Sequence, residues 1–316
     1  MIDLNKQIAA LSFPAEPAGL YEPISYTLAS GGKRLRPQLA LLGAQLFDGN
    51  EDEVLPVALA LEVFHNFTLL HDDVMDKAAV RRGRPTVHVR WNENTAILSG
   101  DQMMIEAYRL LSRIREDKLS EVLRMFNDMA TGICEGQQFD MDFEQRELVT
   151  LDEYLHMIRL KTALLLAYAL RMGAYVAGAD IDAQQHLFDY GIYLGLAFQI
   201  QDDLLDVYGD EKTFGKAIGG DILCGKKTYM LLTALQKADN ITRKQLIDTL
   251  TSSSLSDSEK ITCVTAIYEK LCVRQAEEQT IADYTNQALL CLQALPDNEA
   301  NSRLRDHANS LVRRIL

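Results

Sequence analysis

Apolar residues recur every three or four positions through almost the whole chain. This spacing, which places them on one face of an α-helix, runs through residues 54–74, 97–114, 119–143, 154–176 and 187–207. No stretch alternates apolar and polar residues for long enough to predict a sheet. Because the 316 residues include only 7 prolines and 18 glycines, long helices can run uninterrupted. The sequence therefore predicts an all-α fold.

Breaks in the helical pattern coincide with clusters of glycine, proline and charged residues. They fall at residues 31–32, 77–85, 147–150, 178–182, 209–225 and 252–258. None of them has the composition of an interdomain linker, so we expect residues 1–316 to form a single domain.

The charge balance excludes some classes of partner. The chain has 45 acidic and 32 basic residues, a formal net charge of −13, whereas nucleic-acid binding needs a net basic face. The longest uninterrupted apolar run, residues 163–170, is far shorter than the roughly 20 residues that cross a bilayer. The first residues lack the basic and apolar regions of a signal peptide, and the five cysteines are scattered. We therefore expect no nucleic-acid partner, no membrane span and a cytoplasmic location.

Two acidic clusters each end an apolar helix. The first, HDDVMD at 71–76, contains Asp72, Asp73 and Asp76. The second, QDDLLD at 201–206, contains Asp202, Asp203 and Asp206. Carboxylates one helical turn apart repel one another, and a helix C-terminus disfavours anions, so both clusters are costly without bound cations. Oxygen ligands without Cys or His favour Mg²⁺. The alternative is that the clusters are only solvated acidic surface, which could account for a single cluster but accounts less well for two.

Basic residues gather in short islands near these clusters. The islands contain Lys33, Arg34 and Arg36 in GGKRLRP, then Arg81, Arg82 and Arg84, and finally Lys216, Lys226 and Lys227. Arginine forks and lysine charges beside a carboxylate–metal cluster suit a bound diphosphate, although each island alone could serve surface charge pairing. Lys161, inside an apolar helix, either extends to the surface or faces the same diphosphate.

Six motifs, in order, resemble those of the trans-isoprenyl diphosphate synthases, the polyprenyl synthetase family. They are GGKRLRP, HDDVMDKAAVRRGRPTVH, GQQFD, RLKTA, FQIQDDLLD and GKAIGGDILCGKKT, and together they cover nearly the whole chain. The resemblance is to short-chain members that make farnesyl or geranylgeranyl diphosphate. It implies the isoprenoid synthase fold, a single helical bundle around a deep central cavity, usually as a homodimer. It also implies about three Mg²⁺ per active site.

The same resemblance implies roles for single residues. The Mg²⁺ ligands would be Asp72, Asp76 and Asp202, with Asp140 of GQQFD supporting the water shell of the metal. The allylic diphosphate site would contain Arg81, Lys161, Thr162, Gln199, Lys216 and Lys226. The isopentenyl diphosphate site, which uses no metal, would contain Lys33, Arg36, His65 and Arg82. The catalytic set would be Asp72, Asp73, Asp76, Arg81, Lys161, Asp202, Asp203 and Asp206.

The implied reaction condenses isopentenyl diphosphate with dimethylallyl, geranyl or farnesyl diphosphate by ionisation, condensation and elimination. Metal ions and cations stabilise the departing diphosphate, and apolar walls exclude water that would quench the allylic cation. Three alternatives remain. An all-α structural scaffold with acidic faces would leave the ordered motifs unexplained. A class I terpene cyclase usually has an NDxxSxxxE second motif and no isopentenyl site. A non-catalytic regulatory subunit of a prenyl synthase usually lacks one acidic motif. This chain has GGKRLRP, HDDVMD and QDDLLD.

Product length depends on the side chains below the first aspartates. Thr68, four residues before Asp72, is small, and Phe67, five before, is bulky. In the family, aromatic residues at both positions stop the chain at farnesyl, and an aromatic residue at the earlier position alone resembles archaeal geranylgeranyl synthases. We expect geranylgeranyl rather than farnesyl diphosphate, although residues of other helices can also limit the depth of the cavity in which the product grows.

Overall fold

The computed structural model describes residues 2–209 and 218–313. These form two compact units, and each is described by itself. The first contains the described residues of Met1–Asn127, Tyr168–Phe188 and Leu295–Asn301. The second contains those of Asp128–Ala167, Asp189–Ala294 and Ser302–Leu316. Four boundaries fall inside helices α7 (Glu116–Gln145), α9 (Leu164–Val176), α10 (Ile181–Tyr208) and α17 (Glu299–Arg313), and a fifth falls between Ala294 and Leu295. The single domain expected from the sequence remains a prediction.

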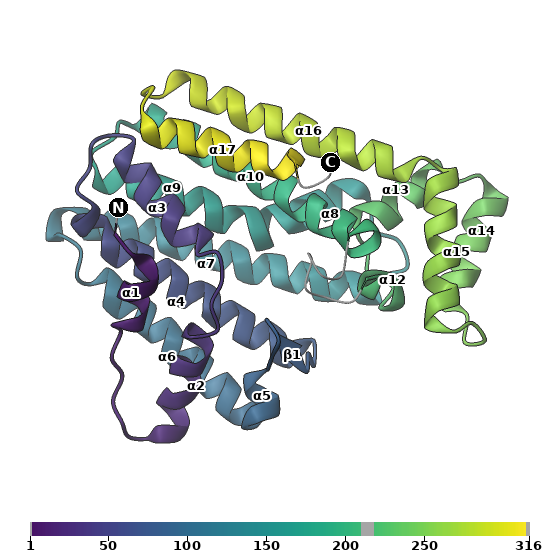
Figure 1. Ribbon diagram of the computed structural model, residues 1–316, viewed down its shortest axis with the longest axis horizontal. Helices are drawn as coiled ribbons and strands as arrows, with labels where there is room; N and C mark the ends of the chain where they lie inside the picture. Colours follow the sequence, from purple (N-terminus) through teal and green to yellow (C-terminus); the bar gives the residue numbers. More distant parts are fainter. Residues whose placement is uncertain (1, 210–217, 314–316) are drawn as a thin grey trace. The chain divides into compact units, whose positions relative to one another are not determined.

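The first unit is built around α4 (Glu51–Met75), which packs against α3 (Leu35–Gln45) and α6 (Glu93–Leu111) (Figure 1). The side chain of Asn50 caps the first turn of α4, where three acidic residues also suit the helix dipole. The other helices that lie wholly in this unit are α1 (Leu4–Ala9), α2 (Ala18–Leu28) and α5 (Val87–Arg90), and both α2 and α5 contact α6. The unit is therefore a set of helices around one long apolar helix.

Among the described helices, α4 alone is long and apolar enough to span a bilayer, by length and composition. However, 67% of its apolar window is buried inside the protein. Glu62, His65 and Asn66 interrupt its apolar sequence and are themselves buried. The core helix of a soluble protein has this character as well, because it is apolar on every side.

The break expected at residues 77–85 contains a short β-hairpin. Strand β1 (Val80–Arg81) pairs antiparallel with β2 (Arg84–Pro85). The two turn residues, Arg82 and Gly83, have positive φ values of 52° and 72°, as a tight two-residue hairpin requires. Two-residue strands are too short to produce an alternating pattern, which is why the sequence did not predict them.

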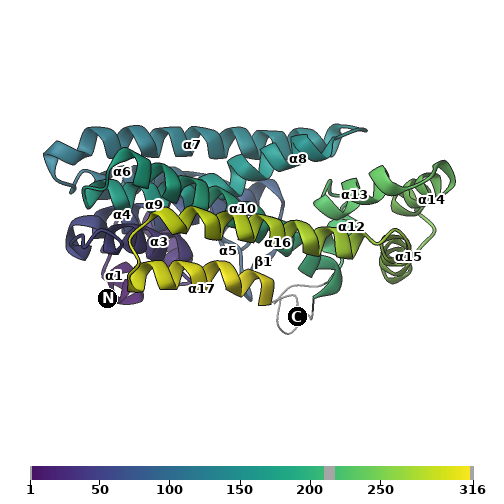
Figure 2. The ribbon, with the colours of Figure 1, turned by 90° about the horizontal axis from the view of Figure 1, so that it is seen from above.

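The second unit includes α8 (Leu151–Ile158), α12 (Gly220–Leu223), α13 (Tyr229–Lys237) and α16 (Val273–Cys291), followed by the short η2 (Leu292–Ala294). Helices α14 (Asn240–Thr251) and α15 (Asp257–Lys270) lie side by side in Figures 1 and 2, and α13 packs against both α8 and α16. Apart from the hairpin, the described residues contain no strand. The all-α fold is confirmed.

A π-helical turn, η1 (Arg159–Ala163), separates α8 from α9, where the sequence predicted one continuous helix. Glycines of neighbouring helices allow a very close approach to this turn. A Cβ atom on Gly136 of α7 would lie 2.4 Å from the backbone nitrogen of Lys161. A Cβ on Gly195 of α10 would lie 2.4 Å from the Cα of Ala163. Such widened turns are rare and occur often at functional sites.

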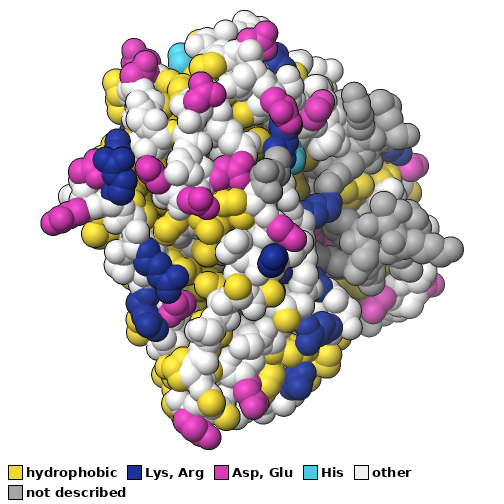
Figure 3. All heavy atoms as spheres, turned by 60° about the vertical axis from the view of Figure 1, so that its left-hand side comes forward, with side chains coloured by type: hydrophobic (Ala, Val, Ile, Leu, Met, Phe, Trp, Pro, Cys, Tyr) yellow, Lys and Arg dark blue, Asp and Glu magenta, His cyan; other side chains and the backbone are white. Residues whose placement is uncertain are grey.

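Charged side chains lie mainly on the surface. On the face drawn in Figure 3, Lys and Arg side chains are interspersed with Asp and Glu. Burying a charge is costly unless it is paired, so the buried exceptions mark places where the fold uses a charge. They include Arg34, Glu62, Asp73, Glu106, Asp203, Asp206 and Glu277.

Candidate active site

The first acidic cluster lies where α4 ends, and its aspartates have different surroundings. Asp73 is buried, and one of its carboxylate oxygens accepts a hydrogen bond from Nε of Arg81 at 2.7 Å. Burial raises the pKa of Asp73, and the charge of Arg81 opposes that rise. Asp76 is exposed at the helix C-cap, and Asp72 is partly exposed one turn earlier. Asp72 and Asp76 are therefore the accessible carboxylates, whereas Asp73 attaches the hairpin to α4.

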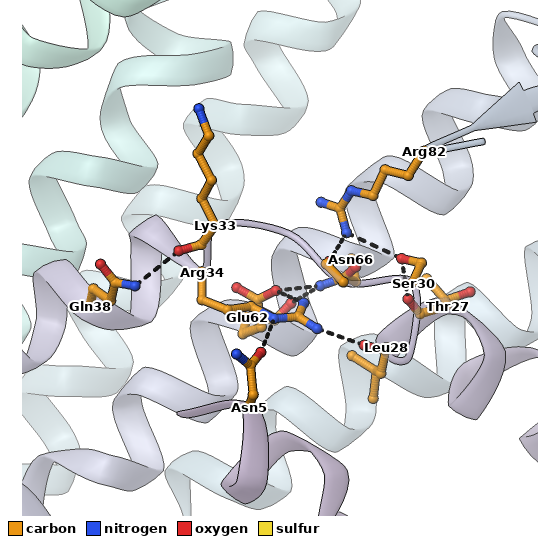
Figure 4. Close-up of polar contacts among 11 residues, drawn as sticks. Asn5, Thr27, Leu28, Ser30, Lys33, Arg34, Gln38, Glu62, Asn66 and Arg82 are labelled. Carbon is orange, nitrogen blue, oxygen red and sulfur yellow. Dashed lines mark hydrogen bonds and ion pairs between the residues drawn. The ribbon is translucent and has the colours of Figure 1, made fainter. Parts of the chain in front are cut away.

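The GGKRLRP segment precedes α3, and its three cations also differ. Lys33 is exposed, Arg36 is half-buried, and Arg34 is buried in an ion pair with Glu62. Figure 4 shows the Lys33 side chain pointing away from the Arg34 guanidinium. Lys33 and Arg36 thus remain more accessible to a ligand than Arg34.

Arg82 of the hairpin reaches the same segment. Its guanidinium donates a hydrogen bond to the carbonyl oxygen of Gly31 and another to Oγ of Ser30 at 3.2 Å (Figure 4). A Cβ atom on Gly32 would lie 3.1 Å from this guanidinium, so glycine leaves the space that Arg82 uses. The structure therefore brings the predicted isopentenyl-site residue Arg82 against the GGKR loop.

His65, the remaining predicted residue of this site, lies buried in α4. Burial lowers its pKa well below the usual value, and the charges of Arg36, Arg82, Arg81 and Arg34 lower it further. Both effects favour the neutral imidazole, and the nearby guanidinium groups create a positive potential that favours an anion. Lys33, Arg36, His65 and Arg82 all belong to the first unit.

In the second acidic cluster, on α10, Asp203 is held entirely by protein groups. Its carboxylate accepts hydrogen bonds from the hydroxyl of Tyr154, from Nε2 of Gln199 at 3.1 Å and from the backbone N–H of Tyr229 at 3.2 Å. Burial, followed by the charge of Asp221, raises the pKa of Asp203 to about 7. Asp203 therefore anchors α10 to α8 and α13.

The other two aspartates of this cluster again divide into one buried and one accessible residue. Asp206 is buried, and its Oδ2 accepts a hydrogen bond from the backbone N–H of Asp221 at 3.0 Å. Asp202 is partly exposed. The accessible carboxylate of the second cluster is thus Asp202, the residue that the resemblance assigns to the metal.

The π-turn brings several predicted residues together in the second unit. Nζ of Lys161 lies 2.6 Å from Oδ2 of Asp140, and the hydroxyl of Thr162 donates to Oε1 of Gln199 at 3.0 Å. Burial raises the pKa of Asp140, but the charges of Lys226 and Lys161 outweigh it and hold that pKa below the usual value. Lys226 is exposed, and Lys216 lies outside the described residues.

Phe67 and Thr68, which the sequence predicts to set the product length, lie on α4 between His65 and the first cluster. The Phe67 ring lies 5.5 Å from that of Phe64 and 4.7 Å from that of His71, measured between centroids. The hydroxyl of Thr68 donates to the carbonyl oxygen of His65 at 2.8 Å. Both side chains are partly exposed.

Sequence reasoning missed Tyr154 and Glu62. Tyr154 lies two helical turns before Lys161, a spacing that could have placed it on the same face. Glu62 is a single acid inside an otherwise apolar stretch of α4, where a buried charge needs a partner. These two signals were present but did not by themselves identify the partners, Asp203 and Arg34.

The accessible carboxylates of the two acidic motifs are suitable ligands for Mg²⁺. Among residues 2–209 and 218–313, no group of three or more His, Cys, Asp or Glu side chains forms a metal cluster, and the two acidic motifs belong to different units. The accessible side chains Asp72, Asp76 and Asp202 offer only carboxylate oxygens, which are the ligands that Mg²⁺ prefers.

Accessible carboxylates at the ends of two helices, with basic residues in the same units, are typical of metal-dependent enzymes that act on diphosphates. A family model described as Polyprenyl synthetase matches residues 17–269. The chain therefore belongs to the polyprenyl synthetase family and is a prenyltransferase with the isoprenoid synthase fold.

Individual relatives and a solved structure support the same family assignment. The chain is similar to a short chain isoprenyl diphosphate synthase of Methanocaldococcus jannaschii, 43% identical over 241 residues that cover 76% of this chain and 73% of that protein. It is also similar to a geranylfarnesyl diphosphate synthase of Natronomonas pharaonis, 38% identical over an alignment of 319 positions that covers 95% of this chain and 91% of that protein. A crystal structure of a geranylgeranyl pyrophosphate synthase matches with a TM-score of 0.92 and 43% identity, covering 98% of this chain and 95% of that one.

Proposed function

We propose that the protein is a short-chain prenyl diphosphate synthase that condenses isopentenyl diphosphate with allylic diphosphates and releases geranylgeranyl diphosphate. The observation that carries the proposal is the cationic site in the first unit, where Arg82 contacts the GGKR loop and buried His65 lies close to the charges of several arginines. The acidic groups beside this site are bound to arginines, Glu62 to Arg34 and Asp73 to Arg81. The site therefore suits the second, metal-free diphosphate that a synthase must bind and a cyclase does not.

In this proposal each group of residues has its own task. Asp72, Asp76 and Asp202 would hold Mg²⁺, with Asp140 supporting its water shell, and the bound metal supplies charge stabilisation for the departing diphosphate. The allylic diphosphate contacts Arg81, Lys161, Thr162, Gln199, Lys216 and Lys226. Isopentenyl diphosphate contacts Lys33, Arg36, His65 and Arg82. The three buried aspartates act through their hydrogen-bond partners. Asp73 keeps the hairpin in place, and Asp203 and Asp206 keep α10 in place.

A product assay tests the function. Purified protein is incubated with Mg²⁺, labelled isopentenyl diphosphate and dimethylallyl, geranyl or farnesyl diphosphate separately, and the products are separated by chromatography. We expect each primer to give geranylgeranyl diphosphate as the longest main product. No elongation from any primer, beside an active reference synthase, would contradict the proposal and favour a cyclase or a regulatory subunit.

The product length is expected to change with Phe67 and Thr68. Phe67→Ala removes a partly exposed ring that packs on His71, and we expect products longer than those of the wild type. Thr68→Phe adds a ring one turn before Asp72, and we expect a shift to farnesyl diphosphate. Phe47→Ala, which removes a partly exposed ring after α3, is the control and should leave the products unchanged. Unchanged products from both α4 variants would show that other residues set the chain length.

We also propose a homodimer in the cytoplasm. Large apolar side chains on α6 are exposed in the first unit, among them Ile97 at 45%, Leu98 at 59% and Ile105 at 53%. A second copy of the chain would cover them, and such a cluster of exposed apolar groups is costly in a monomer. Light scattering is expected to give twice the chain mass of 35.5 kDa for the wild type and the single mass for Ile105→Glu. A monomeric wild type would contradict this proposal.

A further inference from the structure

Arg34, the middle cation of GGKRLRP, has a buried guanidinium that bonds to other groups of the protein. Nη1 lies 2.5 Å from Oε1 of Glu62, Nη2 donates to the carbonyl oxygen of Leu28 at 2.8 Å, and Nε donates to Oδ1 of Asn5 at 3.3 Å. The side chains of Arg34 and Glu62 are only 6% and 4% exposed. The guanidinium therefore links the loop to α1, α2 and α4 at once and does not face a ligand.

The acceptor of this ion pair is itself fixed within α4. Nδ2 of Asn66 donates to Oε1 of Glu62 at 2.9 Å and to the backbone carbonyl oxygen of the same residue at 2.8 Å. His65 lies on the same turn, between Glu62 and Asn66 in sequence. The ion pair consequently attaches the GGKR loop to the turn of α4 that carries His65.

The loop adopts a backbone conformation that needs support. Arg34 has a φ of 49°, and the preceding Gly31 and Gly32 have φ values of 77° and 129°. Glycine adopts such values freely, but a left-handed arginine is strained and persists only where its surroundings hold it. Its contacts with Glu62 and Leu28 supply that support (Figure 4). Lys33 and Arg36 lie within two residues of Arg34, so the path of the backbone at Arg34 affects where both begin.

We infer that Arg34 and Glu62 form a positioning pair for the isopentenyl diphosphate site, fixing the loop so that Lys33 and Arg36 meet the diphosphate beside Arg82 and His65. The inference rests on the proposed function. Neither residue of the pair contacts the substrate. Loss of the pair therefore weakens one substrate site selectively, because Arg81 and Lys161, which we assign to the allylic diphosphate, have partners of their own in Asp73 and Asp140.

The test separates positioning from stability. Arg34→Met and Glu62→Leu are made singly and together, because replacing both partners of a buried ion pair by apolar residues restores stability where a single replacement does not. For the folded double variant we expect the KM for isopentenyl diphosphate to rise about 10- to 100-fold. The KM for the allylic primer should stay within about twofold. Arg34→Lys keeps the charge but loses the fork, and we expect an intermediate rise in the isopentenyl KM.

The exposed pair Arg274 and Glu278 of α16 provides a matched control. The Arg274→Met, Glu278→Leu protein should keep both KM values. A folded Arg34→Met, Glu62→Leu protein with a wild-type isopentenyl KM, or with equal rises in both KM values, would overturn the inference. If the double variant does not fold, the KM values of Arg34→Lys decide in the same way. A wild type without prenyl transfer would instead contradict the proposed function.

Discussion

Replacing Asp72 with Asn is expected to lower kcat on the order of 10³-fold. Asn keeps the size and shape of the side chain but removes the negative charge that a hard cation requires. The helix itself should survive, since the turn is closed by the backbone: the Asp76 N–H donates to the Asp72 carbonyl oxygen at 2.8 Å. The measurement is the rate of prenyl transfer across a Mg²⁺ titration, together with the melting temperature.

Asp248→Asn is the control for this substitution. Asp248 is an exposed acidic residue in the last turn of α14, and the partly exposed Asp72 occupies the last turn of α4. Both substitutions therefore relieve the same unfavourable interaction between a carboxylate and a helix C-terminus. We expect Asp248→Asn to keep wild-type turnover. An Asp72→Asn protein with unchanged turnover and unchanged Mg²⁺ dependence would show that the metal site has been assigned to the wrong residues.

Replacing Gly195 with Ala is expected to have the largest effect on the second unit. The new methyl group would lie 2.4 Å from the Cα of Ala163 and 2.5 Å from its Cβ, so α10 and the π-turn must separate. That movement stretches the 3.0 Å hydrogen bond between Thr162 and Gln199, one turn further along α10. We expect a loss of at least about 2 kcal/mol in the free energy of unfolding. A fall in kcat should accompany it, measured well below the melting temperature.

Gly19→Ala is the matched substitution in an open place. Gly19 lies in α2, and nothing is within 4 Å of the position its Cβ would take. Alanine has the higher helix propensity, so this variant should be as stable as the wild type or slightly more stable. Equal melting temperatures for the Gly195 and Gly19 variants would mean that α10 and the π-turn are not closely packed.

Local patterns in the sequence predicted much of the fold. Apolar periodicity predicted the long helices, and the aspartate motifs were correctly expected at the ends of α4 and α10. The π-turn at Lys161 was missed because periodicity reports which face is apolar and is insensitive to one widened turn. The hairpin was missed because its strands have two residues each.

The sequence could not distinguish the aspartates within a motif. Asp73 and Asp203 look like their neighbours in the chain, yet each accepts hydrogen bonds from a partner that the sequence does not point to, Arg81 and Tyr154 respectively. The same holds for Arg34, which has the same charge as its neighbours in GGKRLRP but pairs with Glu62. Whether each of these side chains is exposed or buried depends on tertiary packing, which cannot be inferred from the spacing of residues in the sequence.

The hairpin between α4 and α5 carries two adjacent arginines with different partners. Arg81 bonds to Asp73 at the end of α4, and Arg82 bonds to Gly31 in the loop before α3. Consecutive Cα atoms are about 3.8 Å apart, so a single peptide unit joins the surroundings of one proposed substrate to those of the other. A shift of the hairpin changes both contacts together. We therefore expect binding of one proposed substrate to change the affinity for the other, by no more than the roughly twofold change expected above for the allylic KM.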